Sequence, residues 1–369
     1  MSKVNELIKK LCPNGVKFYR IKDVAKVTIG EFVHKNKQSD DSPYPVYNGG
    51  TSNTGFYDEF NNDGHKVIIS ARGANAGFIN RVEGKYWAGN SCYTININDE
   101  SQLNWNYLYQ YLKNNQTILL GVQQTGSIPA ISKKQVEEFK IAIPPIEVQE
   151  EIVKILDKFG ELEAELEAEL EARKSQYEFW RGKLLNNTNN YIKLGELCSI
   201  KTGSKPKEIL EDGTVEYINA GTTNSGYTIE SNAKGDCVTT PSRGQGGIGF
   251  VGYQINDFWC GPLCYQIRSM SEKLSNRYLY YFMSANSNYI IGLKHEGGVP
   301  AVNVKELQEM PICVPTVEEQ QKIVNILDRF DKLNNDITVG LPAEIELRRK
   351  QYEYYRNKLL SFEELSVSE

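Results

Sequence analysis

Apolar residues recur every three or four positions over a long segment in the middle of the chain. Ile152, Ile155, Leu156 and Phe159 follow this spacing, and the leucines of a repeated Leu-Glu-Ala-Glu phrase continue the stripe. This periodicity is typical of an amphipathic helix, and the glutamates between the leucines form its solvated face. We therefore expect a helical spacer over 147–189, whose helix of about 40 residues is roughly 60 Å long.

A second segment with the same periodicity covers 316–369. Its glutamates Glu318 and Glu319 suit the first turn of a helix, because the positive end of the helix dipole favours negative charge. The tripeptide from Gly340 to Pro342 is expected to break or kink this helix, with Pro342 near the start of a new one.

The two remaining segments, 1–146 and 190–315, have a different pattern. They contain short β-prone runs such as HKVIISA, YTININ, EYINAG and FVGYQI, separated by turns rich in Gly and Asn. Such runs predict strands, and each segment also has one helical patch. Both segments are therefore predicted to be mixed, mainly β domains.

The chain is also an internal repeat. Residues 126–159 match 297–330 at an offset of 171, and 173–185 match 348–360 at an offset of 175. Weaker matches link the globular parts, including VYNGGTSNTGFY with YINAGTTNSGYT. A pseudo-twofold repeat lets the two long helices pair in antiparallel fashion. The fold is thus predicted as α+β: domain 1–146, central spacer 147–189, domain 190–315 and distal spacer 316–369.

Composition narrows the function. The 369 residues carry a net charge of −5, which argues against a protein that coats nucleic acid indiscriminately. Residues 1–146 are nevertheless mildly basic, with 17 Lys and Arg against 13 Asp and Glu by count. The chain has no apolar run of 18 residues and no secretory leader. Seven scattered cysteines favour reduced thiols, so we expect a cytoplasmic protein without membrane contact.

Patterns that suggest catalysis or metal binding are weak. Cys260 and Cys264 have a loose metal-ligand spacing, but no second Cys or His pair accompanies them. The glycines from Gly244 to Gly249 match a dinucleotide fingerprint, yet a strand-like run follows where a helix would be required. The Asn/Asp-Pro-Pro-aromatic motif of adenine methyltransferases is absent. We predict no catalytic residue, no metal site and no cofactor in this chain.

Several motifs together resemble one family. The prolines before a Glu-rich helix start, the EQ-x-x-I-x-x-I/L-L-D-x-F phrase, the Leu-Glu-Ala-Glu repeats and R-K-x-Q-Y-E-x-x-R-x-K-L-L look like the specificity subunit of type I restriction–modification systems. The resemblance extends to CPNGV at 12–16 and KTGSKP at 201–206.

The resemblance implies a function. Each globular domain would be a target recognition domain that reads one half of a bipartite, asymmetric site in double-stranded DNA. The helices would set the gap between the half-sites and dock two methyltransferase subunits, which use S-adenosylmethionine to methylate adenine. A motor and endonuclease subunit, which requires ATP and Mg, would join the complex for cleavage.

Candidate DNA contacts are polar or basic residues in Gly-, Ser- and Thr-rich loops, where base edges and phosphates can be met. They are Arg72, Arg243, Asn48, Asn219, Gln123, Gln124, Thr125, Ser127, Lys201, Thr202, Ser204 and Lys205. Each of these residues could instead stabilise a turn.

Candidate partner-docking residues lie in the aromatic runs YEFWRGKLL and YEYYRNKLL, because aromatics are enriched at interface centres. They are Tyr177, Trp180, Tyr352 and Tyr355, some of which are expected in the core between the helices. One alternative for the whole chain is a structural coiled-coil adaptor whose domains bind proteins, and another is an enzyme with a cryptic site in one domain, which would show turnover without partners. A DNA-recognition subunit binds DNA in a sequence-dependent, salt-sensitive way, whereas the adaptor does not.

Overall fold

The computed structural model describes residues 2–121, 129–186, 188–295, 298–335 and 340–365. Its contacts divide the chain into two compact units. Unit 1 comprises Met1–Glu165 and Ile345–Glu369, and unit 2 comprises Leu166–Glu344. Each unit therefore combines one globular domain with parts of the long helices.

Unit 1 is built on an antiparallel four-stranded sheet. Its spatial order is β2 (Ala25–Ile29), β8 (Cys92–Ile97), β5 (Lys66–Ser70) and β6 (Ile79–Val82). A second sheet has the order β4 (Gly55–Tyr57), β3 (Tyr44–Tyr47) and β7 (Trp87–Ala88), with β3 and β7 parallel. At the base of the domain, β1 (Phe18–Arg20) pairs with β9 (Lys140–Ala142).

Short helices complete unit 1. They are α1 (Ser2–Leu11), α2 (Ile21–Val24), η1 (Lys35–Lys37), α3 (Trp105–Asn114), α4 (Gln116–Gly121) and α5 (Lys133–Glu137). The helix α3 starts where it does because the Asn104 side chain accepts the backbone N–H groups of Asn106 and Tyr107. Its Leu108 and Leu112 are fully buried in the main core cluster, which also contains Ile69 of β5.

Unit 2 repeats this architecture. Its four-stranded sheet has the order β11 (Cys198–Thr202), β17 (Cys264–Ser269), β14 (Cys237–Pro241) and β15 (Gly252–Gln254). Its second sheet has the order β13 (Tyr227–Thr228), β12 (Val215–Ile218) and β16 (Trp259–Cys260). The two-stranded sheets are β10 (Tyr191–Lys193) with β20 (Pro311–Cys313), and β18 (Lys294–His295) with β19 (Ala301–Val302).

The short helices of unit 2 follow the same scheme. They are α7 (Leu194–Leu197), α8 (Asn276–Ala285), α9 (Ser287–Gly292) and α10 (Val304–Gln308). Ser275 caps α8, as Asn104 caps α3. The repeat found in the sequence is therefore a repeat of strand order and of helix placement, even where few residues are identical.

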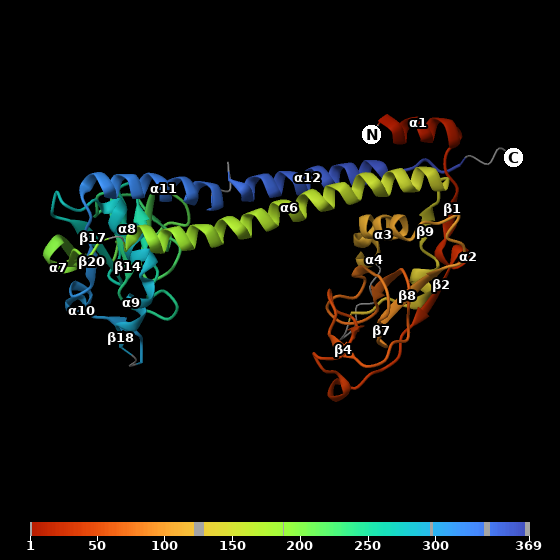
Figure 1. Cartoon of the computed structure of the whole chain (residues 1–369), viewed down its shortest axis with the longest axis horizontal. Coiled ribbons are helices and arrows are strands. Elements are labelled where there is room, and N and C mark those ends of the chain that lie inside the picture. The colour runs from red at the N-terminus through yellow and green to blue at the C-terminus, as the bar shows by residue number, and fades with distance from the viewer. Residues whose placement is uncertain (1, 122–128, 187, 296–297, 336–339, 366–369) are drawn as a thin grey trace. The chain divides into compact units, whose positions relative to one another are not determined.

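The long helices are α6 (Ile146–Leu185), α11 (Val317–Asn335) and α12 (Leu341–Leu359). In unit 1, α12 lies beside the first half of α6 in antiparallel orientation (Figure 1): Phe159 stacks on Tyr355 at 5.4 Å, and Glu163 pairs with Arg349 at 2.6 Å. In unit 2, the second half of α6 packs near α11, with Tyr177 facing Phe330 at 6.1 Å.

The predicted fold class is confirmed: two similar, mainly β domains and long antiparallel helices. The helix break is also found, because α12 begins at Leu341 with Pro342 as its second residue. The four-part division at 146, 189 and 315 stays a prediction, since the two contact-based units each take up half of α6.

Candidate nucleic-acid interface

Four loops of unit 1 come together at one end of the four-stranded sheet. They follow strands β2, β7, β3 and β5, and we call their residues 30–34, 88–91, 48–50 and 71–73 the unit 1 loop row. Each loop is in close contact with the next one in the row. A Cβ at Gly30 would lie 2.0 Å from the Ala88 carbonyl oxygen, and one at Gly89 would lie 2.4 Å from Asn48 Oδ1. Only glycine permits these close approaches.

Unit 2 has a matching loop row, made of residues 203–206, 260–263, 219–221 and 242–244. A Cβ at Gly203 would lie 1.8 Å from the Cys260 carbonyl oxygen, and one at Gly261 would lie 2.4 Å from Asn219 Oδ1. Glycines at equivalent positions therefore allow the same close contacts between loops in both rows. Most of the predicted DNA contacts that the structure describes lie on these two rows.

Asn48 and Asn219 hold the rows together. The Asn48 side-chain oxygen accepts the backbone N–H of Ser91 at 2.9 Å, and that of Asn219 accepts the backbone N–H of Leu263 at 3.0 Å. Both side chains are half-buried. They were predicted as DNA contacts, but their oxygens are used to join neighbouring loops, so their structural role is the better supported one.

Arg72 and Arg243 present exposed side chains on the two rows. Their backbones are fixed by bridges to Ala130 and Ala301, respectively. Within the described residues, neither guanidinium group has a hydrogen bond or an ion pair. Both groups are thus held at matching places and remain available for an external partner.

The charge of each arginine affects the pKa of a buried tyrosine on the neighbouring strand. Burial raises the pKa of the Tyr93 hydroxyl, and the charge of Arg72 partly opposes that rise. Burial likewise raises the pKa of Tyr265, with Arg243 opposing it. Tyr93 donates to the Ile131 carbonyl at 3.1 Å, and so stays neutral and tied to the segment beside the arginine.

Lys201 and Thr202 end the edge strand β11 of the unit 2 sheet, and Ser204 and Lys205 follow it. All four are exposed. Ser204 is partly used by the scaffold, because its carbonyl accepts the Trp259 indole N–H at 2.8 Å and its backbone N–H donates to Cys260 at 3.1 Å. Lys205, the next residue, is a second cation on the unit 2 row, in addition to Arg243. The other four candidates, Gln123, Gln124, Thr125 and Ser127, lie outside the described residues.

The corresponding loop of unit 1 was not predicted from the sequence. The Trp87 indole N–H donates to the Glu31 carbonyl at 2.9 Å, just as Trp259 does to Ser204. Phe32 therefore occupies the place of Lys205, followed by η1 with its exposed Lys35 and Lys37. The matching tryptophans were a usable signal, but EFVHK and SKPKE share too few residues for the repeat to be visible there.

The predicted docking aromatics are placed mostly within the units. Tyr352 is half-buried and donates to Gln110 at 2.9 Å, while Tyr355 and Tyr177 pack against the main core clusters. Trp180 is 37% exposed. The most exposed aromatics of the two runs are Phe179 at 64% and Tyr354 at 59%.

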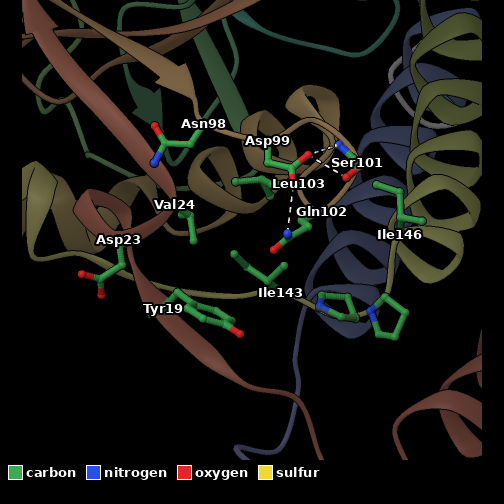
Figure 2. Close-up of a pocket in the computed structure, with 12 residues that line it drawn as sticks. Tyr19, Asp23, Val24, Asn98, Asp99, Ser101, Gln102, Leu103, Ile143 and Ile146 are labelled. Atoms are coloured by element: carbon green, nitrogen blue, oxygen red, sulfur yellow. Dashed lines mark hydrogen bonds between the residues drawn. The ribbon is translucent and has the colours of Figure 1, made fainter.

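A cavity of about 540 Å³ lies at the base of the unit 1 domain, away from the loop row. Figure 2 shows Asp99 at its wall, bonded to Ser101 and Gln102. The bond from the Ser101 hydroxyl, at 2.6 Å, is the main cause that lowers the pKa of Asp99. The described residues that line this cavity include no His, Cys, Lys or Arg, and the Ser101 hydroxyl at its wall donates to the Asp99 carboxylate.

In the described parts of the chain, no group of three or more His, Cys, Asp or Glu side chains could hold a metal ion. None of the described helices is long and apolar enough to cross a membrane. The predicted absence of a cofactor stays a prediction.

Comparisons with known proteins agree with one another. A family model described as "Type I restriction modification DNA specificity domain" matches twice, over residues 13–172 and 186–347. A putative type I restriction enzyme specificity subunit of Haemophilus influenzae is 30% identical over 352 residues, covering 86% of this chain and 88% of the relative. A putative type I specificity subunit of Mycoplasma pneumoniae is 31% identical, covering 81% of this chain and 94% of that protein.

A solved structure supports the fold. The S subunit of a type I restriction–modification system from M. genitalium superposes with a TM-score of 0.65 at 21% identity, over 94% of this chain and 96% of that one. The duplicated family match follows the duplicated strand order described above. The chain belongs to the family of type I restriction–modification DNA specificity subunits.

Proposed function

We propose that this chain reads a bipartite, asymmetric DNA site, with one half-site contacted by each loop row. The observation that carries the proposal is the duplicated row: equivalent loops hold Arg72 and Arg243 exposed and without a described partner. Arginine is the side chain best suited to bidentate contacts with guanine and to phosphates. Other exposed side chains of the two rows differ, such as Phe32 and Lys205, so we expect the two half-sites to differ.

The helix α6 sets the gap between the half-sites. It runs without interruption from Ile146 to Leu185, so it joins the two units through one continuous element. One Leu-Glu-Ala-Glu phrase adds about 6 Å, which corresponds to nearly two base pairs at about 3.4 Å each. Glu163 pairs with Arg349 of α12 at 2.6 Å, whereas Glu161, Glu169 and Glu171 pair with residues of α6 itself. A change in the number of phrases therefore shifts one pairing between the helices and otherwise changes the length of α6.

The long helices dock two methyltransferase subunits, and through them the motor and endonuclease subunits. Two equivalent exposed surfaces support this: Phe179 with Trp180 and Lys183 on α6, and Tyr354 with Lys358 on α12. Aromatics beside a cation are typical of interface centres. Tyr177, Tyr352 and Tyr355 support these surfaces from within the units.

The chain itself is non-catalytic and acts in the cytoplasm, where it meets DNA. S-adenosylmethionine, ATP and Mg belong to the partner subunits. Membership of the specificity-subunit family favours DNA recognition over the protein-binding adaptor.

Methylation mapping tests the proposal. The chain is co-expressed with its cognate methyltransferase subunit, and modified adenines are sequenced for the wild type and for variants that lack or gain one Leu-Glu-Ala-Glu phrase. We expect a bipartite motif whose half-sites are unchanged and whose gap shortens or lengthens by about two base pairs. Loss of methylation in the deletion variant alone would also fit, provided that the insertion variant shifts the gap.

Other outcomes contradict specific parts of the proposal. The same gap in all three proteins would make α6 a brace and not a spacer. A single continuous motif would contradict one half-site per row. Alanine variants of Phe179 and Tyr354 that assemble with the methyltransferase as well as the wild type does would remove the docking surfaces.

A further inference from the structure

We propose that Phe32 is a specificity-determining residue, and that its ring contacts an apolar part of a base in the half-site read by unit 1. The inference rests on the proposed DNA contact of the loop rows and adds the chemistry by which the two rows differ. Nothing in the motifs of the sequence pointed to this residue. It is identified by its place on the unit 1 loop row.

The loop that carries Phe32 is fixed on both sides of the ring. Before it, Glu31 donates its backbone N–H to the Ala88 carbonyl at 2.8 Å and accepts the Trp87 indole N–H at 2.9 Å. After it, Val33 is buried in a small cluster with Trp87. The Phe32 side chain between them is 59% exposed. A phenyl ring is thus presented to solvent by a backbone that cannot easily turn it inward.

Exposure of one apolar side chain is common and is not evidence of a site. The setting of Phe32 is what distinguishes it. His34 packs edge-on against its ring, with centroids 4.7 Å apart, and the exposed Lys35 and Lys37 follow in η1. A supported ring beside two cations fits a nucleic acid, in which apolar base surfaces lie between phosphates.

Unit 2 presents a different group at the same place. Lys205 follows Ser204, which is held by Trp259, and precedes the buried Pro206. Phe32 likewise follows Glu31, held by Trp87, and precedes the buried Val33. One scaffold position therefore carries a phenyl ring in unit 1 and an ammonium group in unit 2. An ammonium group suits guanine acceptors or a phosphate, whereas a ring suits an apolar base surface.

Two base features could supply that apolar surface: the C5-methyl group of thymine, or the face of a base at an unstacked step. The variants Phe32→Ala and Phe32→Leu distinguish them. Leucine can still contact a methyl group, but it cannot stack on a base. Replacing thymine by deoxyuridine at the affected position removes only the methyl group, and 2-aminopurine beside it reports unstacking by a rise in fluorescence.

The experiment uses the full chain co-expressed with its methyltransferase subunit, with methylation mapping and binding of synthetic DNA sites as readouts. For Phe32→Ala we expect one base position of one half-site to be relaxed, with about 5- to 100-fold weaker discrimination there. The other half-site and the gap should not change. Lys205→Ala should affect only the opposite half-site.

Ile255→Ala is the matched control. Ile255 is a 75% exposed residue that follows β15 at the opposite end of the unit 2 sheet from the loop row, and its loss should change neither half-site. Circular dichroism checks that each variant is folded.

The outcomes separate this inference from the proposed function. If Arg72→Ala and Lys205→Ala relax the motif while Phe32→Ala leaves discrimination within about twofold, the inference about Phe32 is wrong and the loop rows stand. If all three variants keep the wild-type motif, the rows do not face DNA and both ideas fail. If discrimination falls equally at every base, Phe32 contributes to affinity only, and its role in specificity is refuted.

Discussion

A fully buried glutamine at the start of each helical segment offers a quantitative test of how a domain is fixed to its helix. Gln320 lies in the first turns of α11 and is 0% exposed. Its Oε1 accepts the Ser275 backbone N–H at 3.0 Å, and its Nε2 donates to the carbonyls of Lys273 and Pro315 at 2.7 and 2.9 Å. One side chain thus ties the helix to the loop that starts α8.

The variant Gln320→Leu keeps the size of the side chain and removes all three bonds. Each abandoned buried group costs about 1–3 kcal/mol, and the Lys273 carbonyl lies toward the lower value because its residue is exposed. Burial of the leucine side chain in place of the amide stabilises the folded state by about 1 kcal/mol. With the three groups each in the lower half of that range, at about 1–2 kcal/mol, we expect a net loss of about 2–5 kcal/mol in the free energy of unfolding, or about 4–20 °C in Tm for a unit of this size.

The neighbouring Gln321 provides a matched control. It is exposed and bonds only the exposed Asn325, at 2.9 Å, among the contacts described for it. Gln321→Leu should therefore change stability by about 0.5 kcal/mol at most. Urea denaturation followed by tryptophan fluorescence measures both variants, and hydrogen exchange of the peptide before α8 locates the effect. A loss below about 1 kcal/mol for Gln320→Leu would refute the reasoning, because water would then replace the three contacts.

The variant Gln320→Glu adds a test by pH. A carboxylate there would be buried and would face two carbonyl oxygens, so the folded-state pKa would be raised above the unfolded value of about 4.3. The folded state then binds more protons than the unfolded state, and stability falls as the pH rises from about 4.3 to the folded pKa. We expect this variant to approach the wild type in acid and to be least stable at neutral pH. Gln149, with the same three kinds of bond in unit 1, should behave alike.

Two other predictions concern the loop row and the domain base. Gly203→Ala should cost about 3 kcal/mol or more, because its Cβ would meet the Cys260 carbonyl at 1.8 Å. Gly73 has φ +91° but open space around it, so Gly73→Ala should cost only about 1 kcal/mol. Equal losses of Tm in Gly203→Ala and Gly73→Ala would contradict the close packing of the loop row. Arg277→Ala should cost about 2 kcal/mol, since its guanidinium bonds Asp328 at 2.9 Å and lies over three tyrosine rings. Asp328→Asn should cost less than half of that, because its carboxylate is 41% exposed, and a double-mutant cycle measures the coupling.

The sequence was sufficient for features that depend on local periodicity. The stripe through Ile152, Ile155 and Leu156 predicted α6, and Pro342 marked the start of α12. Strands such as β5 were visible as apolar runs. The order of those strands was not, because β5 pairs with β8 across about 25 residues and no local signal specifies that partner.

For several candidates the direction of the side chain could not be predicted from the sequence, and their roles stay predictions. Tyr352 was chosen for docking because its segment is aromatic, but its helix turns that face toward α3, where it bonds Gln110. Asn48 was chosen for DNA because it lies in a polar turn, but its oxygen is directed to the backbone of Ser91. Composition identifies the kind of loop or helix, whereas the direction of each side chain follows from packing between segments that are distant in sequence.

A comparison of the two copies of the repeat separates residues that stabilise the domain from residues that are available for recognition. Gly30 and Gly203, Trp87 and Trp259, and Asn48 and Asn219 are pairs of identical residues, and each contacts its own domain. Phe32 and Lys205 occupy equivalent positions but differ in side-chain chemistry, and both side chains are exposed to solvent. Identity between the two copies therefore accompanies a structural role at these positions. Arg72 and Arg243 depart from that rule, because they are identical, exposed and without a described partner. A binding partner that both domains contact would account for this pair of arginines. A phosphate or a guanine in each half-site would be such a partner.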